Sequence, residues 1–150
     1  NLIEYDMGTF SYTQATNSRK SQGIEFEGKW LASDTISVDG SYAYVDAKTG
    51  TKVAARVPGH DLSISISANI SSKINSNLEI NHIMDYKDTV SGSLVAMPDY
   101  TVTNLAVSYD MANNLLGYVR VQDLMDTDYE TVKDFNTGGR QIFAGIRATF

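Results

Sequence analysis

The residues best suited to chemistry in this sequence are clustered carboxylates and two histidines. Four acidic side chains that could together attract Ca²⁺ lie close in sequence: Asp123, Asp126, Asp128 and Glu130. They lack the glycine and the closing glutamate that a calcium-binding EF-hand loop places at fixed spacing. The favoured interpretation of this cluster is therefore a solvated loop.

Glu25 and Glu27 form a second candidate, because a carboxylate pair can share acid and base roles in catalysis. On an extended chain both side chains point to the same side, about 6.6 Å apart. The flanking residues do not predict a shaped pocket around them. A polar strand that faces water explains this pair better than an active site does.

The only two histidines, His60 and His82, fall on different predicted segments and would have to meet in space to bind a metal. A two-histidine metal site is the less favoured interpretation. The phosphate-binding P-loop and the G-x-S-x-G and H-E-x-x-H motifs do not occur. We therefore expect no enzyme activity, no catalytic residues, no metal site and no cofactor.

Composition narrows the class of protein further. The 150 residues include 18 acidic and 12 basic side chains, which gives a net charge of −6, and there is no cysteine. Disulfides, thiolate zinc sites and cysteine nucleophiles are thus excluded within the sequence. An acidic chain without a basic cluster argues against nucleic acid as a partner. No apolar run is long enough for a transmembrane helix, although strands that alternate polar and apolar residues can also cross a membrane.

The elements that must position these residues are strands, because apolar and polar residues alternate along most of the chain. The clearest run is 62–70, in which Leu62, Ile64 and Ile66 alternate with serines. Together with a less regular first strand at 3–12, eight strands are predicted. The other predicted strands are 24–30, 36–44, 78–86, 105–109, 115–122 and 142–150.

The predicted connections alternate between short and long. Short turns are expected at 32–34, 71–76 and 110–114, and longer loops at 15–20, 47–59, 87–97 and 125–138. In an antiparallel up-and-down sheet, this alternation places all the long loops at one end. Transmembrane β-barrels of the outer membrane show this asymmetry. The sequence therefore favours an all-β, antiparallel, up-and-down transmembrane barrel segment.

Charged residues follow the polar phase of this alternation. A lysine or arginine on the lipid side at mid-membrane would cost about 2–4 kcal/mol, so the phase of the charges tests the barrel interpretation. Seven charged residues are predicted to face a water-filled lumen: Glu25, Glu27, Lys29, Asp39, Glu79, Arg120 and Arg147.

The last predicted strand alternates regularly and ends on an aromatic residue. This pattern resembles the C-terminal assembly signal of bacterial outer-membrane proteins. The residues that carry the resemblance are Ile142, Ala144, Ile146, Ala148 and Phe150.

Five segments, in order along the chain, resemble motifs of TonB-dependent outer-membrane receptors. They are Gln22–Glu27, Arg56–His60, Pro98–Val102, Arg120–Glu130 and Gly138–Phe150. In the last two segments, the positions that match the family motifs are Arg120, Asp123, Leu124, Asp126, Tyr129, Gly139 and Arg140. Asp123, Met125 and Gly138 stand where the family motif has Asn, Phe and Pro, which indicates a divergent member.

The resemblance implies a barrel of about 22 strands in the bacterial outer membrane, occluded by a plug domain. Such receptors take up scarce nutrients such as ferric siderophores, with energy from TonB. Residues 1–150 would supply about eight strands of the C-terminal barrel portion. The plug and the TonB box would lie elsewhere in the full-length protein. Outer-membrane lipid, the plug, TonB and a ferric siderophore or similar nutrient are the expected partners. The sequence does not identify ligand-binding residues, which are expected in the long loops.

Two alternatives remain open at this point. Eight strands can close into a self-contained outer-membrane barrel with a structural or adhesive role, in which the first strand would pair with the last. The same alternation also fits a soluble β-sandwich binding domain, in which the apolar faces of two sheets meet.

Overall fold

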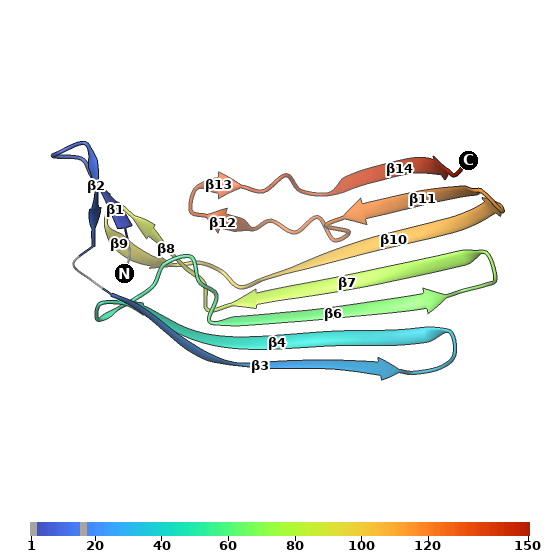
Figure 1. The fold of residues 1–150 in the computed structure, drawn as a ribbon, viewed down its shortest axis with the longest axis horizontal. Helices are drawn as coiled ribbons and strands as arrows, with labels where there is room; N and C mark the ends of the chain where they lie inside the picture. The colour runs from blue at the N-terminus through green and yellow to red at the C-terminus, as the bar shows by residue number, and fades with distance from the viewer. Residues whose placement is uncertain (1–2, 16–17) are drawn as a thin grey trace.

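A computed structural model describes residues 3–15 and 18–150, and its main feature is one antiparallel sheet (Figure 1). The strand order across this sheet is β14-β11-β10-β7-β6-β4-β3, and the two-residue β5 pairs with β4. The strands of the sheet are β3 (Arg19–Leu31), β4 (Ile36–Thr49), β5 (Lys52–Val53), β6 (His60–Asn69), β7 (Ile74–Met84), β10 (Tyr100–Ala112), β11 (Leu115–Gln122) and β14 (Gln141–Ala148).

Three two-stranded hairpins lie outside this sheet, at the end opposite its tight turns (Figure 1). They are formed by β1 (Ile3–Asp6) with β2 (Ser11–Gln14), β8 (Lys87–Val90) with β9 (Ser93–Ala96), and β12 (Glu130–Val132) with β13 (Phe135–Asn136). We call this the loop end, and the opposite end the turn end. The alternation of short and long connections expected from the sequence is thus present.

Strand register aligns most of the apolar residues of the seven long strands on one side of the sheet. Val38 pairs with Ile66, Ile66 with Leu78, and Leu78 with Leu105. Leu105 then pairs with Val121, and Val121 with Ile142. Because directly paired residues of antiparallel strands share a face, this row defines an apolar face. The intervening serines, asparagines and charged residues define the polar face.

The apolar face is not covered by other parts of the described chain. Phe26, Trp30, Ile142 and Ile146 each keep about two thirds of their surface exposed, at 65%, 66%, 69% and 67%. Soluble monomers rarely leave so large a contiguous apolar surface open. This face therefore requires a further apolar environment.

The predicted strand at 3–12 is wrong. This stretch is broken by a turn at residues 7–10 and folds back as the β1–β2 hairpin, outside the main sheet. The Asp6 carboxylate causes the turn, since it accepts hydrogen bonds from the Gly8 N–H at 2.8 Å and the Thr9 hydroxyl at 2.8 Å. The eighth strand of the main sheet is the short β5 instead.

Several predicted loop boundaries also need correction, because strand pairing continues past the alternating stretches. Ala47 lies inside β4, where it pairs with Ser21, and Ala112 lies at the end of β10. The predicted loop 87–97 contains the β8–β9 hairpin, and 125–138 contains the β12–β13 hairpin. The predicted loop 15–20 includes residues 16–17, which lie outside the described residues.

Neither alternative architecture occurs in the described residues. β3 and β14 lie at opposite edges of the sheet and do not pair, so the sheet does not close on itself as an eight-stranded barrel. The small hairpins provide no second sheet to cover the apolar face, as a sandwich would require. Among residues 3–15 and 18–150, no helix has the length and apolar character needed to cross a membrane.

Candidate functional site

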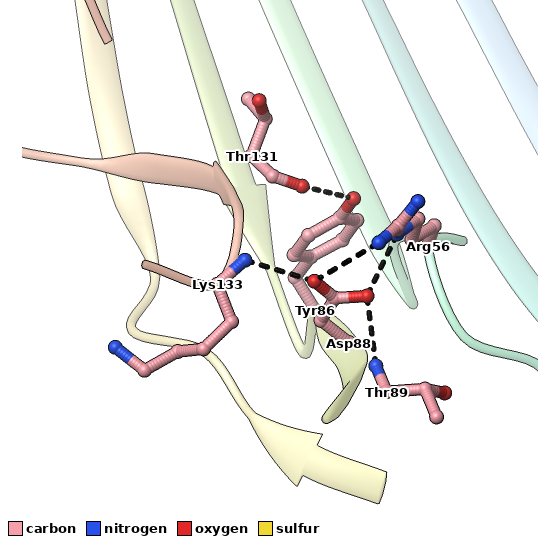
Figure 2. Close-up of polar contacts among 6 residues, drawn as sticks. All are labelled: Arg56, Tyr86, Asp88, Thr89, Thr131 and Lys133. Atoms are coloured by element: carbon pink, nitrogen blue, oxygen red, sulfur yellow. Dashed lines mark hydrogen bonds and ion pairs between the residues drawn. The ribbon is translucent and has the colours of Figure 1, made fainter. Parts of the chain in front are cut away.

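Three separate segments meet at the loop end around the carboxylate of Asp88, and we call this cluster the loop clamp (Figure 2). Arg56, from the segment between β5 and β6, donates from Nε to Asp88 Oδ1 at 2.7 Å and from Nη2 to Oδ2 at 3.5 Å. The backbone N–H of Lys133, between β12 and β13, donates to Oδ2 at 2.8 Å. One side chain thus ties together three connections that are far apart in sequence.

Asp88 is the most buried side chain of the described residues, with 1% of its surface exposed. The Arg56 guanidinium, followed by the backbone N–H groups of Lys133 and Thr89, lowers the pKa of Asp88 from 3.8 to about 2. These donors stabilise the charged form more than burial disfavours it. The carboxylate therefore stays ionised, and the clamp closed, at all ordinary pH values.

Tyr86 reinforces the same junction. Its hydroxyl donates to the Thr131 carbonyl at 2.8 Å, which connects the start of the β8–β9 hairpin to β12 (Figure 2). Burial, followed by the nearby Asp88 charge, raises the pKa of Tyr86. The backbone N–H of Arg56 donates to the Lys87 carbonyl at 2.7 Å. Arg56 adopts a φ of 59°, a strained value for a non-glycine residue that the surrounding contacts hold in place.

The sequence predicts only part of the loop clamp. Arg56 belongs to one of the family-like segments, whereas no motif in the sequence marks Asp88 or Tyr86. Asp88 falls in a stretch predicted as a loop, where an acidic residue ordinarily faces solvent. Its burial depends on Arg56 and Lys133, which are 32 and 45 residues away, so local pattern contains no signal for it.

The family-motif residues form a second structured corner between β11 and β14. Asp123, at φ 50°, accepts the Thr127 N–H on Oδ1 at 3.1 Å, while its own N–H donates to Asn104 at 3.1 Å. Leu124 donates its N–H to the Thr103 carbonyl at 2.7 Å. The other carboxylate oxygen of Asp123, Oδ2, is buried without a hydrogen-bond partner.

Asp126 closes the same corner against the start of β14. It accepts the Arg140 backbone N–H at 2.9 Å and faces the Arg140 guanidinium at 3.4 Å. The backbone N–H of Arg140 is the main reason that the pKa of Asp126 is lowered. Gly139 provides the left-handed φ of 63° that this turn uses. Tyr129 stacks on Tyr100 with ring centroids 4.4 Å apart, so the motif residues shape this corner of the loop end.

The seven residues predicted to face a lumen all lie on the polar face by register. Glu25, Glu27 and Lys29 pair with Ala43, Ser41 and Asp39, and Glu79 pairs with Ser65 and Asn104. Arg120 pairs with Phe143, and Arg147 with Leu116. Their assignment to a lumen remains a prediction, because the described chain encloses none.

Three contacts of these polar-face residues range from exposed to half-buried. Lys29 and Asp39 form an ion pair at 3.2 Å, and Asn104 donates to Glu79 at 3.2 Å. The Arg120 guanidinium lies 4.7 Å from the centre of the Phe143 ring, a cation–π contact. This face offers charges and amides to whatever lies against it.

The residues of the suggested assembly signal form the outer row of β14. Ile142, Ala144, Ile146 and Ala148 pair with Val121, Val119, Gly117 and Leu115, all on the apolar face. Phe150 lies two residues beyond the end of β14 and is fully exposed. Their role in assembly stays a prediction.

The two histidines lie on neighbouring strands, and each has a different partner. The Tyr42 hydroxyl and His60 Nδ1 are 2.6 Å apart, and His82 Nδ1 and the Thr101 hydroxyl are 2.8 Å apart. Among residues 3–15 and 18–150, no group of three or more histidine, cysteine or acidic residues is arranged to hold a metal ion.

Residues 1–132 match the sequence model of the family described as "TonB dependent receptor-like, beta-barrel". The chain belongs to this family. The match covers four of the five family-like segments completely, and the fifth, Gly138–Phe150, lies outside it. No curated protein sequence matches the chain.

Solved structures extend the likeness over the whole chain. The pyoverdine outer-membrane receptor FpvA of Pseudomonas aeruginosa PAO1 aligns over 100% of this chain and 25% of its own, with a TM-score of 0.80 and 19% identity. The ferric-catecholate import receptor Fiu of E. coli K12 aligns over 99% and 23%, with a TM-score of 0.75 and 17% identity. The copper transporter OprC aligns over 99% and 26%, with a TM-score of 0.74 and 13% identity.

The fold is therefore that of a β-barrel segment of a TonB-dependent receptor. Related receptors are outer-membrane β-barrels, and the chain spans about a quarter of the length of the structures described above. Identities of 13–19% show the shared fold and do not identify a ligand.

Proposed function

We propose that this chain forms part of the barrel wall of an outer-membrane transporter that takes up ferric siderophores, without enzyme activity. Its strands would be the C-terminal portion of the barrel. The apolar face would contact outer-membrane lipid, and the polar face would line the interior and contact the protein's own plug domain. TonB would supply the energy in the full-length receptor.

One observation carries this proposal: from β3 to β14 the long strands keep most of their apolar residues on the same face, with Leu116 and Phe143 among the exceptions. Lipid suits a broad, mainly apolar surface of this kind, while the serines, asparagines and charges of the opposite face need water or polar partners. The loop end would then be extracellular and the turn end periplasmic, as in outer-membrane barrels generally.

Siderophores are the favoured ligand class because two similar structures are a ferripyoverdine receptor of Pseudomonas aeruginosa and the ferric-catecholate import receptor Fiu. The experiment is growth of an iron-starved bacterium whose own siderophore receptors are deleted, complemented with the full-length receptor. We expect at least one ferric siderophore to restore growth, and expect growth to require TonB. Restoration by none across hydroxamate, catecholate and mixed chelates, with the receptor present in the outer membrane, would show that the cargo is not a siderophore.

A further inference from the structure

A small hollow of about 260 Å³ lies where β10, β11 and β14 meet the corner formed by the family-motif residues. Gln122 pairs with Gln141 across β11 and β14, and Asn104 pairs with Glu79, so the hollow lies on the polar face. Its volume falls below the range of about 300–1,000 Å³ that is usual for pockets of organic ligands. It has room for an ion with several water molecules, since each water occupies about 30 Å³ in the liquid.

Asp123 is a buried lining residue of this hollow, with 5% of its surface exposed. Its Oδ1 accepts the Thr127 N–H at 3.1 Å, but its Oδ2 is buried and has no hydrogen-bond partner among residues 3–15 and 18–150. A buried carboxylate oxygen without a partner is costly, because the charge has lost its water and gained no replacement. A cation beside Oδ2 would offset this cost.

Contacts of the corner hold the Asp123 carboxylate in this position. The N–H of Asp123 donates to Asn104 Oδ1 at 3.1 Å, and its carbonyl accepts the Asp126 N–H at 3.0 Å. The N–H of the next residue, Leu124, donates to the Thr103 carbonyl at 2.7 Å. Turning the carboxylate toward solvent would break its remaining hydrogen bond. The hollow is therefore formed before an ion arrives, which lowers the entropy cost of binding.

The basic side chains near this acidic cluster are engaged by other carboxylates. Arg140 faces Asp126 at 3.4 Å, and Lys133 pairs with Glu130 at 3.0 Å. No lysine or arginine lines the hollow in the part of the chain that the structure describes. The positive charge that Asp123 Oδ2 requires must therefore come from a bound ion.

The other polar groups that line the hollow offer oxygen atoms. Asn104, Gln122 and Gln141 have amide oxygens, and Thr137 has a hydroxyl that donates its proton to the Tyr129 carbonyl at 3.0 Å. An oxygen donor set that includes a carboxylate suits a hard cation. Ca²⁺ fits this set better than Mg²⁺ does, because Ca²⁺ accepts six to eight oxygens in flexible geometry, whereas Mg²⁺ demands an octahedron and keeps its waters.

Two of the three departures from the family motifs lie in this hollow. Asp123 stands where the motif has asparagine and Gly138 where it has proline, and both line the hollow. A Cβ atom at residue 138 would lie 2.7 Å from the Gln141 amide nitrogen, so glycine at this position leaves room for that amide. The extra charge and the extra space therefore occur together in this chain.

We propose that this hollow is a Ca²⁺ site, with Asp123 Oδ2 as its charged ligand. The amide oxygens of Gln122 and Gln141 and the Thr137 hydroxyl would supply neutral ligands, and water would complete the coordination. The ion would join the end of β11 to the start of β14 and stabilise the corner between them. A site with one carboxylate should bind Ca²⁺ with a Kd on the order of 10⁻⁴–10⁻³ M. The inference does not depend on which cargo the receptor transports.

The test measures hydrogen exchange of the Thr127 amide, which the Asp123 carboxylate holds, in the full-length receptor in detergent micelles. Exchange is followed from a Ca²⁺ chelator to about 10 mM Ca²⁺, ten times the weakest expected Kd. We expect roughly tenfold slower exchange or more at the highest concentration, because an ion that binds only the closed corner stabilises it by that factor. Mg²⁺ at the same concentration should have a clearly smaller effect.

Asp123→Asn removes the charged ligand and keeps an oxygen that can accept the Thr127 N–H, so its exchange should not respond to Ca²⁺ in this range. The matched control Asp128→Asn removes the same charge from an exposed position in the same loop and should respond as the unaltered receptor does. Heat-modifiable gel mobility confirms that each variant is a folded barrel.

Terbium luminescence provides a second measurement of the same site. Tyr129 lines the hollow and stacks on Tyr100, so Tb³⁺ bound in place of Ca²⁺ should emit when tyrosine is excited. Ca²⁺ should displace this emission, and Asp123→Asn should remove the displaceable part. The inference is overturned by unchanged Thr127 exchange on addition of Ca²⁺, by an equal response in Asp123→Asn, or by an equal response to Mg²⁺.

Discussion

The strands of the main sheet, which we call the wall, and the loop end of this molecule are stabilised in opposite ways. Along the wall, apolar side chains such as Phe26 and Ile146 stay mostly exposed, and adjacent strands are joined by continuous backbone pairing. At the loop end lie most of the buried side chains, among them Tyr86, Asp88 and Met97. The wall depends on its surroundings, whereas the loop end supplies its own packing and polar partners.

The difference shows where sequence changes should matter. On the wall, the face that a side chain occupies decides the outcome, because lipid and water accept different residues. At the loop end, the effect of a substitution depends on the partners of the side chain, since a buried charge without its partner is costly. Three substitutions and one change of pH test these two dependences.

The largest effect is expected from Ile64→Arg, on the apolar face of β6. An arginine near mid-membrane on the lipid side costs about 2–4 kcal/mol, so the full-length receptor should fold poorly into lipid vesicles. The matched variant Ser65→Arg lies on the opposite face, where it pairs in register with Asp39 and Glu79, and should fold normally. Folding yield is measured by heat-modifiable gel mobility. Equal yields for the two variants would refute the assignment of faces.

The next effect is expected from Asp88→Asn at the loop end. The variant loses the Arg56 ion pair, so the amides of Thr89 and Lys133 should exchange with deuterium about tenfold faster or more. Amides of the wall strands β6 and β7 should be unaffected. The control Asp134→Asn removes an exposed charge from the β12–β13 hairpin, where Asp134 forms an ion pair with Lys133 at 3.3 Å. Unchanged protection in Asp88→Asn would mean that the ion pair does not hold the loops.

Acid provides a weaker and reversible version of the same perturbation. The pKa of Asp88 is about 2 in the closed clamp and 3.8 ordinarily, so the contribution of its charge is complete above pH 3.8 and is lost as pH falls toward 2. We expect loop-end amides to lose protection across that interval, while the backbone-paired wall keeps its own. Hydrogen exchange at pH 5, 3 and 2 measures this, after correction for intrinsic rates. In Asp88→Asn the pH dependence should disappear.

The smallest effect is expected from Asp123→Asn, which restores the residue of the family motif. Asp123 Oδ2 is buried without a partner, and an amide removes that buried charge while its oxygen still accepts the Thr127 N–H. The Thr127 amide should gain about 1 kcal/mol of protection against exchange. Asp128→Asn, at an exposed position nearby, should change nothing. Reduced protection in Asp123→Asn would contradict this account of the corner.

The wall was predictable from the sequence, because a period of two records the face of each residue directly. The alternation at 62–70 fixes β6, and its serines and isoleucines fall on opposite faces as expected. The prediction of a first strand at 3–12 was wrong because the turn after Asp6 depends on hydrogen bonds to one carboxylate. Alternation of polar and apolar residues contains no signal for such a turn. The loop clamp could not be predicted from the sequence for a related reason. Asp88 is buried only because Arg56 and Lys133 approach it from distant parts of the chain.

The order of strands in the sheet has a consequence for how the chain reaches this state. From β3 to β14, each long strand lies beside the one that comes before it in sequence, with no crossover. Every strand therefore finds its partner already in place if pairing starts at β3 and proceeds toward β14. Pairings of this kind close short loops first, and such topologies fold with small entropic barriers. The sheet can grow one strand at a time, with the newest strand always at its edge.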